Sequence, residues 1–196
     1  MASHRALFSW GPYRARELGA TDVPALQRFF DANPEYFETV NGRGPRADEA
    51  HQEFIELPPA GMTFEKKWML GFFDAHEALV GMATVLSDFI ARQVWHIGLF
   101  IIATPLHGQG VSRPLYEGLE AWMRESGALW VRLGVVIGNR RAERFWERLG
   151  YVEVRQRTGI ETGLRISDIR VMVKRVGGGP LTEYRALVAR DRPGTP

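Results

Sequence analysis

The sequence contains no cysteine among its 196 residues. Disulfide bonds, a thiolate nucleophile, and zinc or iron–sulfur sites built on cysteine are therefore excluded. Long hydrophobic runs are missing too, because the longest, Ile97–Ala103, has the length of a strand, whereas a membrane helix needs about 18 apolar residues. No apolar segment of the signal-peptide type opens the chain. These absences predict a cytoplasmic protein that does not bind a membrane, and no metal site is expected.

A marked excess of charge is also missing, since 25 basic residues face 23 acidic ones and leave a net charge of +2. The arginines are scattered, whereas a nucleic-acid binder usually carries a basic stripe with interleaved aromatic residues. Nucleic acid is therefore not expected as a partner, and the small basic excess fits a local site for an anionic ligand. Hydrophobic residues make up 45% of the chain, which is enough to form a buried core.

Three parts are expected along the chain. Residues 1–11 show no clear pattern and are interpreted as a lead-in, residues 12–176 as one domain, and residues 177–196 as an appendage. The appendage begins with a flexible Gly-Gly-Gly-Pro link and continues as a short helix. One side of this helix is apolar and packs either on its own domain or on a second copy of the chain, with a homodimer contact slightly favoured. The apolar residues are Leu181, Tyr184, Leu187 and Val188.

Strand and helix patterns alternate within residues 12–176. A first helix is expected to start near Thr21-Asp22, where a cap is available, and to end at Asn33-Pro34. The polar segment 36–59 fits either a surface connection or a loop facing the substrate, with a short helix near 47–57. Helical periodicity also marks 115–123 and 142–149. This pattern predicts an α/β fold. The expected strands are 13–18, 68–73, 78–86, 94–102, 129–137, 152–157 and 166–174.

The loop His107-Gly108-Gln109-Gly110-Val111-Ser112 lies between an expected strand and an expected helix. Glycines let a ligand approach the backbone, and the N–H groups at a helix start attract an anion such as a pyrophosphate. Gly108 and Gly110 fit a simple tight turn equally well. The dinucleotide-binding fingerprint fails because residue 113 is arginine, and the serine-hydrolase elbow and the P-loop motif fail as well.

A second segment, Asn139–Tyr151, follows about thirty residues later and reads NRRAERFWERLGY. Taken alone it is an amphipathic helix with Phe145 and Trp146 in the core. Its spacing resembles the N-x-x-A-x-x-F-[YW]-x-x-L-G-[FY] segment of the GCN5-related N-acetyltransferases. The loop at 108–112 resembles the [RQ]-x-x-G-x-[GA] pyrophosphate loop of the same family, in the correct order. The resemblance covers roughly residues 65–175, or 12–176 with the earlier helix.

This resemblance implies an α/β fold whose mixed, mostly antiparallel sheet is splayed at its centre and flanked by helices. It implies acetyl-CoA as cosubstrate and an unidentified acceptor, a small molecule or a peptide, that offers a primary amine. By the same resemblance the backbone of Leu99–Ile102 pairs with the pantetheine amides and supplies N–H groups to the oxyanion. The residues implied in cofactor binding are Leu99, Ile101, Ile102, His107, Gly108, Gln109, Gly110, Val111, Ser112, Asn139, Ala142, Phe145 and Trp146.

The chain departs from the family pattern at three positions. His107 stands where the family has arginine or glutamine, and Ser112 where it has glycine or alanine. Trp146 replaces the tyrosine that many relatives use as general acid on the departing thiolate. The missing tyrosine leaves open a catalytically degenerate acyl-CoA-binding module, and a nucleotide-binding α/β protein of another kind is a further alternative. Four nearby arginines either reach the cofactor phosphates or are solvated: Arg113, Arg140, Arg141 and Arg144.

His96 is the residue that we expect to act as general base. It lies on the strand expected to carry pantetheine, about where family members often place a glutamate, and an imidazole titrates near neutral pH. A core histidine that never meets the acceptor fits the sequence as well. A bulge in this strand could change the face on which His96 lies. Tyr36 and Glu35 are the reserve candidates for the base.

Overall fold

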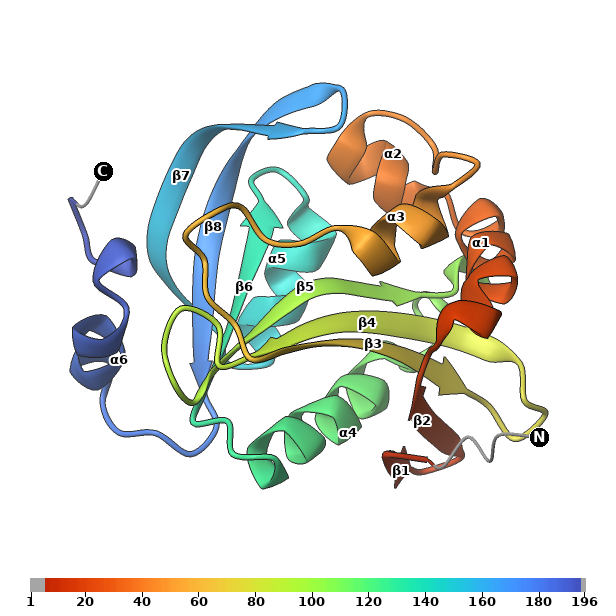
Figure 1. Ribbon diagram of the computed structural model, residues 1–196, viewed down its shortest axis with the longest axis horizontal. Helices are drawn as coiled ribbons and strands as arrows, with labels where there is room; N and C mark the ends of the chain where they lie inside the picture. Colours follow the sequence, from red (N-terminus) through yellow and green to blue (C-terminus); the bar gives the residue numbers. More distant parts are fainter. Residues whose placement is uncertain (1–5, 195–196) are drawn as a thin grey trace.

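An open eight-stranded sheet forms the centre of the computed structural model, which describes residues 6–194 (Figure 1). The strands lie in the order β1-β2-β3-β4-β5-β6-β8-β7, and every neighbouring pair is antiparallel except β5 and β6. The strands are β1 (Phe8–Trp10), β2 (Tyr13–Glu17), β3 (Lys66–Phe73), β4 (Leu79–Ser87), β5 (Val94–Ile102), β6 (Trp130–Val136), β7 (Val152–Thr162) and β8 (Arg165–Arg175).

Helices cover both faces of the sheet. The apolar sides of α4 and α5 pack on one face, and those of α1, α2, α3 and α6 pack on the other. No helix within residues 6–194 is long and apolar enough to span a bilayer. The helices are α1 (Val23–Ala32), α2 (Glu35–Asn41), α3 (Glu49–Ile55), α4 (Ser112–Glu125), α5 (Arg140–Arg148) and α6 (Leu181–Leu187).

A β-bulge divides β5 at Gly98. The ladder with β4 pairs Thr84 with Leu99 and Val85 with Ile97, so that Gly98 is the extra residue. An extra residue shifts the alternation of side chains between the two faces of a strand. Trp95, Ile97, Phe100 and Ile102 consequently pack on the α4 side, whereas Leu99 and Ile101 pack on the side of α1 and α2.

The sheet parts between β5 and β6. Their parallel ladder joins Val94–Ile97 to Trp130–Leu133. Beyond it β5 remains paired with β4 as far as Ile102, and β6 remains paired with β8 as far as Val136. The two halves of the sheet therefore diverge after Ile97, as in the mixed, centrally splayed α/β sheet expected from the sequence, which is confirmed.

The structure differs from the sequence expectations in three segments. β1 lies within the expected lead-in 1–11 and pairs with β2 across a turn at Gly11, while residues 1–5 lie outside the described part. The sequence does not predict α2, because Asn33-Pro34 looks like a helix end, yet Pro34 starts the new helix. β7 and β8 also extend beyond their expected ends into one long hairpin.

The C-terminal segment packs on its own sheet. The side chains of Tyr184 and Val188 are 0% exposed and contact Val94, Trp130 and neighbouring valines of β7 and β8. The slight preference for a dimer contact at this apolar face is therefore corrected, because its two central residues are already covered within one chain. A homodimer formed through another surface stays a prediction.

A buried ion pair fixes this segment to β6. Asp191, which is 0% exposed, accepts hydrogen bonds from Nε and Nη2 of Arg132 at 2.7 and 3.2 Å, and from the hydroxyl of Tyr184 at 2.5 Å. Burial alone would raise the pKa of Asp191, but the hydrogen bonds from Arg132 lower it below its usual range. Since the native pKa is lowered, the pair stabilises the fold above the ordinary pKa of aspartate and is lost on acidification.

Replacing Asp191 by alanine should lower the free energy of unfolding by about 3 kcal/mol, because the buried guanidinium of Arg132 would lose its partner. Denaturant unfolding near pH 7 measures this loss. The control is Glu117→Ala, which removes the exposed Arg113–Glu117 pair and should cost less than about 0.5 kcal/mol. Equal losses in the two variants would contradict an anchoring role for Asp191.

Candidate active site

Two cavities meet where β5 and β6 part. One, of about 610 Å³, lies along the end of β5 and the loop before α4, and is called the loop cavity. The other, of about 670 Å³, lies between α3 and β7 and is called the α3 cavity. Both have the size of small-molecule sites. Five residues line both cavities and mark their junction: Tyr36, Phe100, Asn139, Ala142 and Trp146.

Two glycines shape the loop cavity. Gly108 and Gly110 have φ values of +77° and +79°, a left-handed conformation that favours glycine. A Cβ added to either residue would meet no atom within 4 Å, so the backbone here borders open space. α4 begins at Ser112, directly after this loop, and its first N–H groups add a positive potential. The loop thus offers an anion both close backbone approach and a helix start.

His107 fastens the loop to the end of β5. Its Nε2 donates a hydrogen bond of 2.8 Å to the carbonyl of Ile102, which leaves Nδ1 on the other side, 3.5 Å from a carboxylate oxygen of Glu35. The side chain therefore positions the loop from within. The backbone N–H groups of His107 and Gln109 already donate to the carbonyls of Thr104 and Leu106, so the loop N–H groups left for a phosphate include those of Gly108 and Gly110.

Ten of the thirteen residues expected to bind the cofactor line the loop cavity, and three do not. Leu99 packs in the core beside α1, the amide of Gln109 donates to the carbonyl of Pro105, and Val111 packs against the α4 side of the core. The ten are Ile101, Ile102, His107, Gly108, Gly110, Ser112, Asn139, Ala142, Phe145 and Trp146. Asn33, Thr39 and Thr104 also line this cavity and were not predicted from the sequence. Glu35 and Tyr36, expected only as reserve candidates for the base, and Phe100, which lies within the expected pantetheine strand, complete the lining.

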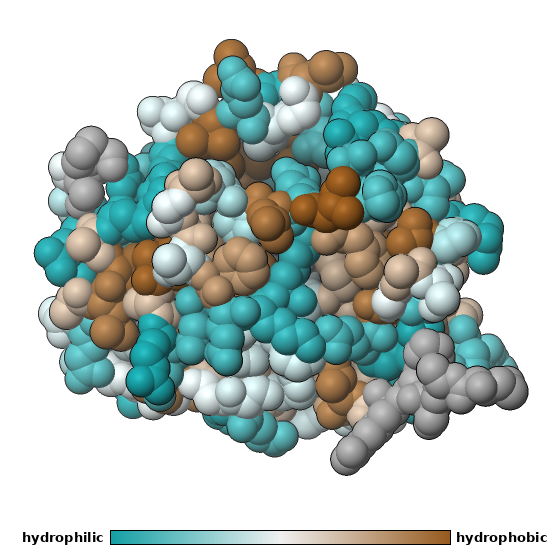
Figure 2. All heavy atoms as spheres, viewed as in Figure 1, coloured by the Kyte–Doolittle hydropathy of each residue, from teal (hydrophilic) through white to brown (hydrophobic). Residues whose placement is uncertain are grey.

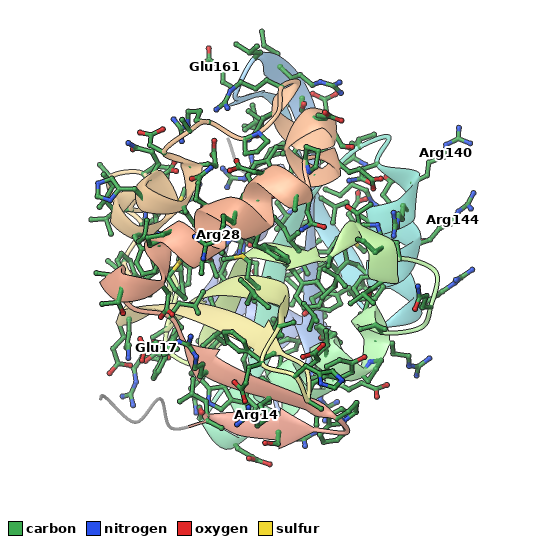
Figure 3. The ribbon with its side chains drawn as sticks, turned by 90° about the vertical axis from the view of Figure 1, so that its right-hand side faces the viewer. Arg14, Glu17, Arg28, Arg140, Arg144 and Glu161 are labelled. Atoms are coloured by element: carbon green, nitrogen blue, oxygen red, sulfur yellow. The ribbon has the colours of Figure 1, made fainter. Side chains whose placement is uncertain are left out.

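Arginines lie around the loop cavity. Arg113, Arg141, Arg144 and Arg148 line it, whereas Arg140 does not. Figure 3 shows Arg140 and Arg144 extending from α5 away from the body of the molecule. Arg113 is paired with Glu117 at 2.8 Å, and a nitrogen of Arg141 lies 3.8 Å from Glu35. The cavity thus has a cationic rim, in keeping with an anionic ligand.

The junction of the cavities is aromatic. Trp146, 7% exposed, packs its ring 5.7 Å from that of Phe100, and its indole carries no hydroxyl. Tyr116 and Tyr151 lie behind it, joined by a 3.0 Å hydrogen bond between their hydroxyls, and neither lines the loop cavity or the α3 cavity. Tyr36 is the tyrosine at the junction. Burial, together with the charges of Glu53 and Glu49, raises the pKa of its phenol, which therefore stays protonated.

A carboxylate from α3 faces the α3 cavity above β4. Oε1 of Glu53 accepts a 2.7 Å hydrogen bond from the hydroxyl of Thr84, and the Nζ of Lys67 lies 3.9 Å away. Burial raises the pKa of Glu53 above its ordinary value, although Thr84 and Lys67 act in the opposite direction. Glu53 was not predicted from the sequence, where the one sign of it is the helix expected near 47–57 in a segment that fits a substrate-facing loop.

His96 lines the same cavity, on the floor formed by the sheet. Its ring stacks on Phe89 at 4.6 Å, and its Nδ1 lies 3.4 Å from a nitrogen of Arg132. Burial and the neighbouring charge of Arg132 lower the pKa of His96 to about 3. A base with so low a pKa takes up a proton poorly at neutral pH, so this environment weighs against the expected role of His96 and favours Glu53.

Figure 2 shows the face that carries the α3 cavity, with apolar residues gathered around its upper middle and polar residues outside them. The cavity is lined by the apolar segment that follows α3, by the parted strands, and by Arg157 and Arg190 at its far side. It combines an apolar body with a few charged groups, as substrate sites commonly do.

Solved structures with a similar fold include acetyltransferases. Spermidine N-acetyltransferase from Vibrio cholerae, solved with CoA and spermine, superposes with a TM-score of 0.66 at 17% identity, over 84% of this chain and 95% of that one. An acetyltransferase from Thermus thermophilus gives 0.65 at 17% identity, over 87% and 99%. The ribosomal-protein-S18-alanine N-acetyltransferase from Escherichia coli gives 0.63 at 15% identity, over 86% and 96%. At these identities the likeness concerns the fold.

No curated protein matches the sequence significantly. The family model of the acetyltransferase (GNAT) family, in contrast, matches residues 26–151, which is more than half of the chain. This match includes both the glycine loop and the segment that begins at Asn139. The resemblance expected from those two motifs is thereby confirmed, and the chain belongs to the acetyltransferase (GNAT) family.

Proposed function

We propose that this protein binds acetyl-CoA and transfers the acetyl group to a primary amine. The observation that carries the proposal is the meeting of the two cavities at the parted strands, with a glycine loop in one cavity and a carboxylate in the other. A long ligand entering along β5 can thereby present its reactive end to a second molecule held under α3. The relatives named above include enzymes that acetylate amines and one structure with bound CoA.

The residues of the loop cavity fit CoA. The backbone of Gly108 and Gly110 would hold the pyrophosphate, with Ser112 at the helix start adding a donor. Past Ile97 the edge of β5 that faces β6 has no strand beside it in the described structure, and this edge would pair with the pantetheine amides. Asn139 caps α5 by accepting a hydrogen bond from the amide of Ala142 and borders the same space.

The transfer joins the amine nitrogen to the acetyl carbon and breaks the carbon–sulfur bond, so the amine loses a proton and the sulfur gains one. Glu53 is our candidate for the proton acceptor, because its carboxylate faces the cavity and burial raises its pKa above the ordinary value of a glutamate. Tyr36, held protonated at the junction, is the candidate donor to the thiolate in place of the usual tyrosine.

The direct test is release of free thiol from acetyl-CoA in the presence of a panel of primary amines. Release that depends on the amine supports acetyl transfer. CoA binding without release for any amine supports the alternative, a catalytically degenerate acyl-CoA-binding module. Stabilisation of the protein by NAD or ATP but not by CoA would instead indicate a nucleotide-binding protein of another kind.

Gly110→Val should weaken CoA binding at least about tenfold, since the added side chain would occupy the space of the pyrophosphate. Isothermal calorimetry measures the affinity. The matched control is Gly61→Val, at a loop position with a φ of +85° and no atom within 4 Å of an added Cβ, so that it carries similar strain away from the loop cavity. Unaltered CoA affinity in a folded Gly110→Val protein contradicts the assignment of the loop.

Glu53→Gln should lower kcat/KM about 100-fold and remove its acid limb, because a glutamine cannot accept the proton. In the wild type that limb should lie above the ordinary pKa of glutamate, since a base is active when deprotonated and burial raises this pKa. His96→Gln is the matched variant, and its rate should fall less than about threefold with the limb retained. If His96→Gln shifts or removes the acid limb of kcat/KM and Glu53→Gln does not, the histidine is the base.

A further inference from the structure

The α3 cavity has walls of opposite charge. Glu53 and Glu56 lie on the side of α3, whereas Arg132, Arg157 and Arg190 lie on the side of β6, β7 and the C-terminal segment. In Figure 1 the elements that bear these residues lie on opposite sides of the parted strands, with α3 toward one end of the sheet and β7 with α6 at the other. The interior therefore has an acidic end and a basic end.

Arg132 is neutralised within the fold. Its guanidinium donates two hydrogen bonds to the carboxylate of Asp191, and the hydroxyl of Tyr184 donates a third to the same carboxylate. Both oxygens of Asp191 are thus engaged in bonds of 2.5–3.2 Å. This group holds the basic wall in place and contributes little spare positive charge to the cavity.

Arg157 and Arg190 do carry spare positive charge. The nearest carboxylate oxygen to Arg157 is that of Asp191 at 3.9 Å, beyond hydrogen-bond distance, and the buried Nε of Arg157 has no hydrogen-bond partner. Within residues 6–194 no carboxylate lies within 4.0 Å of Arg190. Burial and the charges of Arg190, Arg132 and Arg155 lower the pKa of Arg157, so positive charge is crowded here. An anion between these guanidinium groups would relieve the crowding.

The walls are too far apart for one small group to touch both. Glu53 is bonded to Thr84 of β4, and Arg132 is on β6 in register with His96 of β5. Two strand spacings amount to about 10 Å. A molecule that reaches from one wall to the other must therefore place its amine and its acidic group several bonds apart.

The charges also disfavour a polyamine. Arg132 is neutralised by Asp191, so three cationic side chains of the cavity, Lys67, Arg157 and Arg190, stand against two carboxylates. Lys67 partly compensates the acidic wall, since its Nζ lies 3.9 Å from the carboxylate of Glu53 and is held there by a 2.7 Å hydrogen bond to the main-chain carbonyl of Glu56. A ligand with several ammonium groups would meet more repulsion than attraction, whereas a ligand with one ammonium and one carboxylate would match both walls.

The geometry points to an acceptor that carries a carboxylate as well as the reacting amine, such as an amino acid or a short peptide with a free carboxyl end. Its amine lies toward Glu53 and its carboxylate between Arg157 and Arg190. This inference rests on the proposed acetyl transfer and adds to it the chemical class of the acceptor. In this role Arg157 binds the substrate and determines specificity.

Matched pairs of amines test the inference. The panel contains ω-amino acids of three to six carbons, lysine and glycylglycine, each beside its carboxamide, with putrescine and spermidine as amines that lack an acidic group. Binding to the protein saturated with CoA is measured by calorimetry, and turnover by thiol release. At least one acid should bind about tenfold more tightly than its amide, chiefly as a lower KM, because guanidinium–carboxylate hydrogen bonds are charge-assisted.

Arg157→Gln should abolish most of this acid-over-amide preference while leaving the amides unaffected. Arg175→Gln is the matched control, since Arg175 is an exposed arginine at the end of β8 outside both cavities, and it should keep the preference. If Arg157→Gln does not fold, Arg190→Gln serves as the second variant with the same expected result. A preference that survives in the folded variant overturns the inference.

Failure of the inference and failure of the proposed function give different results. Acetyl transfer to amides or polyamines as efficient as to acids overturns the acceptor class and leaves acetyl transfer standing. If the acids bind more tightly than their amides but no thiol is released, the proposed acetyl transfer is wrong, while the binding site for an amine and a carboxylate still stands. Absence of both binding preference and release overturns the two together.

Discussion

The parting of β5 from β6 is the constraint on which the rest of the structure depends. Parallel pairing stops at Ile97 and Leu133, and the bulge at Gly98 follows immediately. Each strand keeps its outer neighbour, so the sheet stays intact while its centre opens. Helices α4 and α5 on one face and α1 to α3 on the other close the opening around two cavities that meet at Trp146.

The C-terminal segment links stability to the site. Asp191 and Tyr184 cover Arg132, a charge that β6 could not bury alone. The same docking brings Arg190 to the wall of the α3 cavity, opposite Glu53. The lowered pKa of His96 follows from burial and from Arg132 beside it. One buried ion pair therefore holds the appendage and places a basic wall, while burial, together with the charge of Arg132, keeps the nearby imidazole neutral.

Local patterns in the sequence predict the parts of the fold that depend on local physics. The apolar run of β5 and the periodicity of α5 mark elements near their observed places, and the two motifs mark most of the loop cavity. The α3 cavity depends on contacts distant in sequence, such as Thr84 with Glu53 and Arg132 with Asp191. The periodicity of the sequence does not indicate such pairs. It does not indicate the bulge at Gly98 either, so the face of the sheet on which His96 lies follows only from the observed register of the strands.

Amide hydrogen exchange with and without saturating CoA tests the central claim most directly. If the opened edge of β5 and the glycine loop receive the cofactor, the amides that become hydrogen-bonded to it should exchange more slowly in the complex. These are the amides within residues 98–102 that point away from β4, and those within residues 108–113 that do not already donate to the chain. The protection should be greatest at these two segments and small in β1, β2 and α6. Saturating CoA that leaves both segments unprotected, or protects only other parts of the chain, would contradict the account.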